Sequence, residues 1–238
     1  MHNGMPTLLV SALRKARRKW RQLAGQEISV AIELSCECVS LGDAEGVWCI
    51  RPDLIDKNSV IYSFGVGEDV CFELALIKRF GATVHAFDPT PRSLQWIRSH
   101  PSVPQLILHE LGIAAVDGKL TFYPPLRNDH VSYSTLVRKE TAAAAVCCEV
   151  RRLRTIMDQL GHDHIDVVKM DIEGSEYDVL SDMLVSQTPV RQLLVEFHHR
   201  WRDIGPGKTG QAIRALSASG YRLFYVSATG MEYSFSRE

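Results

Sequence analysis

The sequence predicts an α/β fold with a mostly parallel sheet of about seven strands, an antiparallel C-terminal hairpin, and helices on both faces. The first observation is a short apolar run at residues 60–64, followed by glycines and a helical stretch to about Phe80. The second is that further apolar runs alternate with helical segments along the chain. The third is a pair of strand-like runs at 221–226 and 231–236, separated by a short turn, which predicts the hairpin.

The first strand, its glycine turn and the following strand predict a nucleoside-type cofactor site. Gly65 and Gly67 let a ligand approach the backbone closely, and the helix that follows presents free N–H groups at its start. Residues 83–87 form a second expected strand, which ends at Asp88. In such folds an acid at this position hydrogen-bonds the two hydroxyls of a ribose.

The charge at the start of the first helix indicates which cofactor fits. Glu68 and Asp69 open the expected helix, and two carboxylates there would repel a diphosphate. S-adenosylmethionine carries a sulfonium and an amino group, so it fits this charge better than NAD does. Two alternatives stay open at this point: a nicotinamide-dependent oxidoreductase on the same architecture, and a cofactor-binding module without turnover.

Length, charge and cysteine content limit the classes of protein to which the chain can belong. With 238 residues and a formal charge of −1, the chain is long enough for one full domain and has no global field to recruit nucleic acid. No apolar run approaches the roughly 20 residues that span a bilayer, and the first ten residues lack the basic-then-apolar order of a signal peptide. The six cysteines form no C-x-x-C pair, which is typical of free thiols in a reducing compartment. We expect a cytoplasmic protein.

The expected organisation is an N-terminal arm and lead-in over residues 1–40, followed by a single domain over residues 41–238. Residues 1–26 contain no acid and a cluster of arginines and lysines, and apolar residues recur there at helical spacing: Leu9, Leu13, Ala16, Trp20 and Leu23. Such a basic amphipathic helix can lie on an anionic membrane surface, dock on a partner subunit in an oligomer, or fold onto its own domain.

The middle of the chain contains an irregular insertion. Asp117-Gly118 predicts a hairpin turn between strands at 113–116 and 120–123. Residues 124–145 are polar and irregular, and next to a cofactor fold such a segment is often a substrate loop or lid. His130, Ser132 and Tyr133 are its candidate contacts to a small-molecule substrate that carries a hydroxyl.

Five segments, taken together, resemble the FkbM-type methyltransferases that use S-adenosylmethionine. They occur in the order seen in that family: SFGVGED, VHAFDPTP, LGIA, VVKMDIEGSEYDVL and LVEFHHR. The resemblance covers roughly residue 46 to the C-terminus, and K-x-D-x-E-G-x-E is its most specific piece. It implies the Rossmann-like fold of class I methyltransferases. It also implies O-methylation of a hydroxyl, often on a sugar or a secondary metabolite.

The resemblance also implies a set of cofactor-binding residues at the strand ends. The methionine part of the cofactor would contact Phe64, Gly65 and Gly67, and its amino group would contact Glu68 or Asp69. The ribose would bind Asp88, and the adenine would lie against Thr90, Gly112 and Ile113. The methyl group would point toward Asp171.

Catalysis requires a group that removes the hydroxyl proton of the acceptor. Asp171, Glu196 and His198 all lie at or just beyond strand ends on the same rim. The sequence leaves open which of the three is the base: His198 is a candidate because an imidazole titrates near neutral pH, although His198 and His199 begin a loop where solvated histidines are also common. Alternatively, the three residues hold a divalent metal such as Mg²⁺ that acidifies the hydroxyl. Glu173 is a weaker candidate, because acids at a helix start often serve only the helix dipole.

Overall fold

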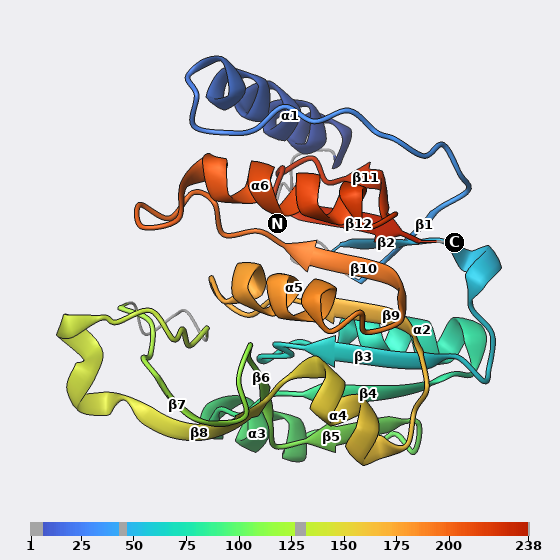
Figure 1. Ribbon diagram of the computed structural model, residues 1–238, viewed down its shortest axis with the longest axis vertical. Helices are drawn as coiled ribbons and strands as arrows, with labels where there is room; N and C mark the ends of the chain where they lie inside the picture. Colours follow the sequence, from blue (N-terminus) through green and yellow to red (C-terminus); the bar gives the residue numbers. More distant parts are fainter. Residues whose placement is uncertain (1–6, 43–46, 127–131, 238) are drawn as a thin grey trace, which may run out of the picture.

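A computed structural model describes residues 7–42, 47–126 and 132–237, and its centre is a seven-stranded sheet (Figure 1). The strand order is β11-β12-β10-β9-β3-β4-β5. The strands are β3 (Val60–Phe64), β4 (Thr83–Phe87), β5 (Leu106–His109), β9 (Ile165–Met170), β10 (Val190–Glu196), β11 (Arg222–Val226) and β12 (Glu232–Ser236). Only β12 runs antiparallel to its neighbours within this sheet, where it lies between β10 and β11. The predicted fold class is confirmed, including the C-terminal hairpin.

Helices cover both faces of this sheet. The α-helices are α1 (Thr7–Leu23), α2 (Cys71–Phe80), α3 (Pro91–Arg98), α4 (Leu153–Leu160), α5 (Glu176–Val185) and α6 (Gly205–Ala218), and two short 3₁₀ helices span Pro52–Leu54 and Lys139–Ala144. Side chains alternate between the faces: Val168 packs in the core with α4, α5 and α6, whereas Val167 packs in the core with α2. Because both faces are covered, every residue of β9 is buried, as expected for a central parallel strand.

Two smaller sheets flank the main one. β1 (Val39–Leu41) and β2 (Trp48–Ile50) pair antiparallel. The other sheet has the order β6-β8-β7 and contains β6 (Gly112–Ile113), β7 (Gly118–Phe122) and β8 (Val146–Arg151). The predicted hairpin at Asp117-Gly118 is therefore wrong, because β8 lies between the two segments that were expected to pair. The Asp117 carboxylate instead accepts hydrogen bonds from Arg152 N at 2.8 Å and Thr155 Oγ1 at 3.0 Å, which ties this turn to the start of α4.

The first helix of the cofactor fold begins later than predicted. α2 starts at Cys71, and Glu68 and Asp69 lie in the turn before it. Asp69 Oδ1 accepts a hydrogen bond from Cys71 N at 2.8 Å, so this carboxylate satisfies one of the free donors at the helix start. Glu68 forms an ion pair with Arg92 of α3 at 2.7 Å. Hydrogen bonds and an ion pair thus fix both acids in the turn between β3 and α2.

The lead-in after α1 covers the outer edge of the sheet. Glu33 N and Leu34 N both donate to Leu223 O of β11, at 2.8 and 3.1 Å. This contact protects an edge strand whose backbone groups would otherwise be open to pairing with another chain. Among the helices of the described residues, none is both long enough and apolar enough to cross a bilayer.

Candidate active site

A cavity of about 530 Å³ opens at the carboxyl edge of the main sheet, where ligands bind in open α/β folds. It is lined by all ten residues predicted for the cofactor: Phe64, Gly65, Gly67, Glu68, Asp69, Asp88, Thr90, Gly112, Ile113 and Asp171. Ser132, Tyr133 and Glu196 line the same cavity. His198 lies behind this lining, and His130 falls outside the described residues. One cavity therefore joins the predicted cofactor residues to two of the predicted catalytic ones.

Gly65 brings the ends of β3 and β9 into direct contact. Its φ is +75°, and a Cβ atom at this position would lie 1.6 Å from the backbone carbonyl oxygen of Asp171. Asp171 N also donates to Phe64 O at 3.1 Å. Because no side chain fits between the two strands, the backbone at Gly65 forms part of the cavity wall directly beside Asp171.

Asp88 is buried and fixed by three hydrogen bonds. Its Oδ2 accepts from Gly67 N at 3.0 Å, and its Oδ1 accepts from Thr90 N at 2.9 Å and Thr90 Oγ1 at 2.7 Å. A carboxylate offers about four lone-pair sites, so roughly one remains for a ligand. This geometry gives Asp88 a fixed direction and leaves it room to accept one hydroxyl.

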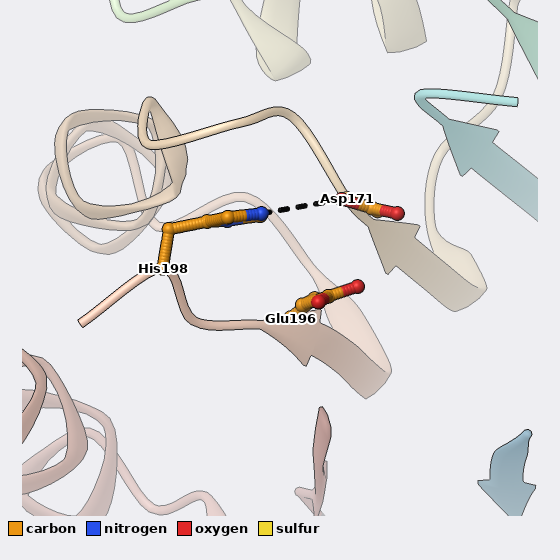
Figure 2. Close-up of side chains that lie close together, drawn as sticks. All are labelled: Asp171, Glu196 and His198. Carbon is orange, nitrogen blue, oxygen red and sulfur yellow. Dashed lines mark ion pairs between the residues drawn. The ribbon is translucent and has the colours of Figure 1, made fainter. Parts of the chain in front are cut away.

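At the other end of the cavity, four carboxyl groups surround His198. The His198 Nδ1 lies 3.0 Å from Glu176 Oε1, and its Nε2 lies 3.4 Å from Glu173 Oε2 and 3.8 Å from Asp171 Oδ1. Figure 2 shows the imidazole pointing toward Asp171, with Asp171 and Glu196 at the ends of the adjacent strands β9 and β10. Glu176 is fully buried, and its Oε1 also accepts from Ile172 N and Gly174 N. Glu176 therefore fixes both the imidazole and the loop after β9.

This crowding changes the protonation of the cluster. Burial lowers the pKa of His198, but the surrounding carboxylates of Glu176, Asp171 and Glu173 outweigh burial and raise it to about 10. Burial and the nearby Asp171 carboxylate raise the pKa of Glu196 to about 9. Burial also raises the pKa values of Asp171 and Glu173. At neutral pH, His198 is therefore a cation, and Asp171 and Glu196 cannot both be fully ionised.

The protonated imidazole bears on two of the predicted roles. A cation cannot accept a proton, so the raised pKa of His198 argues against this residue and for a carboxylate as the general base. Asp171, Glu196 and His198 do place ligand atoms within 4.8 Å of one another, as a metal site would require. A metal bound there would have to displace the proton from the imidazole. Without a metal, the imidazole and the surrounding carboxyl groups form a proton-sharing cluster.

The protonation of this cluster predicts a stability that falls with rising pH. Both folded-state pKa values lie above the ordinary ones, from 6.5 to about 10 for His198 and from 4.5 to about 9 for Glu196. The folded state thus binds these protons more tightly, so its advantage is complete below the ordinary values and is lost as pH rises toward 9 and 10. We expect the melting temperature to fall between pH 6.5 and 10, with a shallower slope in Glu196→Gln. Equal slopes in both proteins would contradict the shifted Glu196.

Comparison with known proteins identifies the family. The model of the family described as "Methyltransferase FkbM domain" matches residues 57–223, which is more than half of the chain. The chain belongs to the FkbM methyltransferase family. It is 30% identical over 148 residues to the "Probable methyltransferase-like protein 24" of Rattus norvegicus, a match that covers 61% of this chain and 34% of that protein. The Homo sapiens protein of the same name is 29% identical over 181 residues, covering 71% of this chain and 43% of that protein. The chain thus spans less than half the length of these relatives.

Solved structures resemble this FkbM domain in fold. The fibrillarin pre-rRNA processing protein of Methanococcus jannaschii matches with a TM-score of 0.50 and 10% identity, covering 80% of this chain and 70% of that one. The FkbM methyltransferase of Methylobacillus flagellatus KT has a TM-score of 0.49 and 15% identity, covering 79% and 46%. At these identities the fibrillarin match bears on the fold alone. The family assignment sets aside the nicotinamide alternative.

A buried polar group beneath Gly65 in the FkbM domain was missed by the sequence-based prediction. Glu73 is 1% exposed and accepts a hydrogen bond of 2.5 Å from Ser63 Oγ. The Lys169 Nζ lies 3.8 Å from Glu73 Oε1, donates to Gly65 O at 3.3 Å, and lies 5.3 Å from the centre of the Trp48 ring. Two signals could have found this group: a lysine inside the buried strand IDVVKM, and a glutamate on the helix face that buries Leu76.

The described part of the predicted substrate loop is attached to the loop that follows β9. Ser134 Oγ donates to the backbone oxygen of Glu173 at 2.7 Å, and Thr135 Oγ1 lies 2.7 Å from Ser175 Oγ. Glu173 itself has a φ of +54°, which is rare for a residue with a side chain and typical of functional sites. In the FkbM domain, residues 132–136 therefore hold a strained backbone segment at the cavity.

Proposed function

We propose that this chain is an S-adenosylmethionine-dependent O-methyltransferase that acts on a hydroxyl of a small molecule, of the sugar or secondary-metabolite kind. The observation that carries the proposal is the single cavity that runs from Asp88 to the carboxyl pair Asp171 and Glu196 in an FkbM domain. A cofactor site and a proton acceptor in one cavity are the two things that methyl transfer to oxygen requires.

The lining residues fit a nucleoside cofactor. Asp88 offers a fixed acceptor for a ribose hydroxyl, and the tightly packed Gly112 and the adjacent Ile113 form a surface suited to a flat ring. The Asp171 side chain is 30% exposed and lines the cavity, while its buried Oδ1 lies 3.8 Å from His198 Nε2. The exposed part of this carboxyl group is therefore the part that faces a ligand. A volume of about 530 Å³ is within the usual range for small-molecule sites.

The carboxyl pair supplies the base in this proposal. When bound, the cofactor supplies a methyl group already activated by a positively charged sulfur. Asp171 and Glu196 orient the acceptor oxygen toward that methyl carbon, and their positively charged ligand lowers their pKa values, so that one carboxylate accepts the hydroxyl proton. The O–CH₃ bond would form as the S–CH₃ bond breaks, with the neutral thioether as the leaving group, and the O–H proton would pass to the carboxylate. His198 is a positioning residue: its cation fixes Asp171 and Glu173 and limits the repulsion between the acids.

Asp88→Asn should weaken cofactor binding. One oxygen becomes an NH₂ group, so the hydrogen bond to Gly67 N or to Thr90 is lost along with the negative charge. We expect the binding free energy of S-adenosylhomocysteine to fall by about 1.5–3 kcal/mol, as measured by calorimetric titration. Asp178→Asn, an exposed carboxylate on α5, is the control and should bind like the unaltered protein. Unchanged affinity in Asp88→Asn would remove this placement of the ribose.

The deciding experiment is a calorimetric titration of S-adenosylhomocysteine, with added Mg²⁺ and with EDTA, followed by a screen of hydroxyl acceptors using S-adenosylmethionine labelled in the methyl group. Binding in the micromolar range that is the same in Mg²⁺ and EDTA, and label transferred to oxygen, supports the proposal. Binding that requires Mg²⁺ would instead favour a metal at Asp171, Glu196 and His198. Binding without transfer to any hydroxyl would favour the module without turnover.

A further inference from the structure

Helix α1 attaches to the domain through its polar side. Figure 1 shows α1 as the outermost element, beyond α6 and β11. Among residues 13–24, only Arg18, Arg21 and Gln22 are half-buried, and the remainder are exposed. These three residues recur at helical spacing, so they form one face of the helix. Arg18 Nη1 donates to Ser227 O at 3.2 Å, and Gln22 Nε2 donates to Ile28 O at 2.9 Å.

The opposite face of α1 is apolar and open to solvent. Leu13 is 55% exposed, Trp20 61% and Leu23 82%, and Ala16 is exposed between them. These residues lie at i, i+3, i+7 and i+10, which places them in one stripe along the helix. A helix that packs only against its own domain would bury such a stripe, whereas α1 exposes it and contacts the domain through Arg18, Arg21 and Gln22.

Basic side chains border the apolar stripe on both sides. Arg17 lies along one side and Lys19 along the other, and both are exposed. Arg14 and Lys15 lie farther round the helix, toward the attached side, and are also exposed. Residues 1–26 contain six basic residues and no acid, whereas the whole chain carries 27 basic and 28 acidic residues. The positive charge is thus concentrated on this helix, and the rest of the chain is net acidic.

The attachment point of α1 lies on the same edge of the sheet as the active site. Ser227 follows the carboxyl end of β11, which runs parallel to β10 because both are antiparallel to β12. Glu27, just after the helix, is fully buried and pairs with His199 at 2.6 Å and Arg200 at 2.7 Å. His199 and Arg200 directly follow His198 of the carboxyl cluster. The helix is therefore attached at the same edge of the sheet as the cavity, at the β11 end of the strand order.

We propose that α1 binds the surface of an anionic phospholipid bilayer, with Leu13, Trp20 and Leu23 inserted at the boundary between headgroups and acyl chains. An exposed apolar stripe flanked by lysines and arginines is the arrangement that lies flat in this boundary, and tryptophan is enriched there. The flanking cations meet lipid phosphates and carboxylates. This inference goes beyond the proposed reaction and does not depend on it.

The charge and the apolar stripe of α1 favour a bilayer over two other partners, a second copy of the chain and a nucleic acid. A second copy that packed its α1 against this one would bring two sets of basic side chains together with no acid in residues 1–26 to offset them. A nucleic acid would meet the cations at the sides of the helix, but it would leave the stripe of Leu13, Trp20 and Leu23 exposed at the centre.

The test is flotation of the full chain with vesicles of phosphatidylcholine alone and of phosphatidylcholine with phosphatidylserine. We expect the protein to float with the anionic vesicles, and less so with the neutral vesicles or at high salt. The triple variant Leu13→Ser, Trp20→Ser, Leu23→Ser should lose roughly tenfold or more in partitioning. Its control is Val116→Ser with Val185→Ser, two exposed apolar residues elsewhere, which should float like the unaltered protein.

Charge reversal tests whether the lysines of α1 contribute to binding. Lys15→Glu with Lys19→Glu should reduce flotation with anionic vesicles several-fold, whereas Lys57→Glu with Lys78→Glu, exposed on other elements, should have little effect. The melting temperature should be unchanged in all variants, which shows that they are folded. The proposal would be overturned if the protein floated with neither kind of vesicle. It would also be overturned if the two control variants lost as much flotation as the α1 variants. Dimerisation through Trp20, or a gel shift with RNA in place of flotation, would also overturn it.

Discussion

Glu196→Gln and Asp171→Asn should each reduce kcat by roughly 10²- to 10⁴-fold, which is the usual contribution of a positioned acid or base. Both side chains line the cavity, and the pKa of Glu196 is raised to about 9 by burial and by Asp171. An amide has nearly the same shape as the carboxyl group, but it cannot accept the hydroxyl proton. The measurement is turnover with an acceptor found in the screen, together with the affinity for S-adenosylhomocysteine.

The two variants should affect turnover much more than cofactor binding. The double variant should be no worse than about the poorer single variant, since the two carboxyl groups act as one proton acceptor. Asp178→Asn serves as the control for an exposed acid. If His198→Gln lost as much activity as Glu196→Gln and also lost the rise of activity with pH that the unaltered protein shows, the assignment of the base to the carboxyl pair would be wrong. A role in positioning predicts that this rise remains but moves to another pH.

Gly65→Ala should have the largest effect on the structure of the site. The new methyl group would lie 1.6 Å from the carbonyl oxygen of Asp171, and Gly65 has a φ of +75°. Neither backbone can yield without separating the ends of β3 and β9 in the centre of the sheet. We expect a loss of about 4 kcal/mol or more in the free energy of unfolding. We also expect no measurable binding of S-adenosylhomocysteine, with denaturant unfolding and calorimetry as the two measurements.

Gly161→Ala is the matched control for this substitution. Gly161 has a φ of +71°, almost the same as Gly65, but a Cβ there would meet no atom within 4 Å. Gly161→Ala should therefore lose only the conformational part of the free energy of unfolding, about 1 kcal/mol, and should bind S-adenosylhomocysteine normally. A Gly65→Ala protein as stable as Gly161→Ala would show that the two strand ends are not in contact as described.

The parts of the fold that were predictable from the sequence are those set by local patterns. Apolar runs such as IDVVKM predicted the central strands because such strands are buried on both faces. The start of α2 was placed too early, because Asp69 accepts a hydrogen bond at the helix start instead of belonging to the helix. The hairpin at Asp117-Gly118 was wrong because a distant segment, β8, pairs with both of its expected strands.

The positions of the site residues were easier to predict from the sequence than their protonation states. Strand ends that share an edge of the sheet placed Asp88, Asp171 and Glu196 at one cavity. The protonation of His198 depends on Glu173 and Glu176, which reach it only after the loop beyond β9 folds back. Neighbours in space, which have no fixed spacing in the sequence, decide such a pKa.

The attachment of residues 132–136 to the loop after β9 has a consequence for how acceptors are selected. Ser134 and Thr135 hold Glu173 and Ser175 through hydrogen bonds, so the two loops form one mechanical unit. An acceptor that fits poorly and displaces the first loop also displaces the Glu173 carboxyl beside His198. Under the proposed function, we expect discrimination among acceptors to appear in kcat, because displacement of Glu173 disturbs the carboxyl groups around His198.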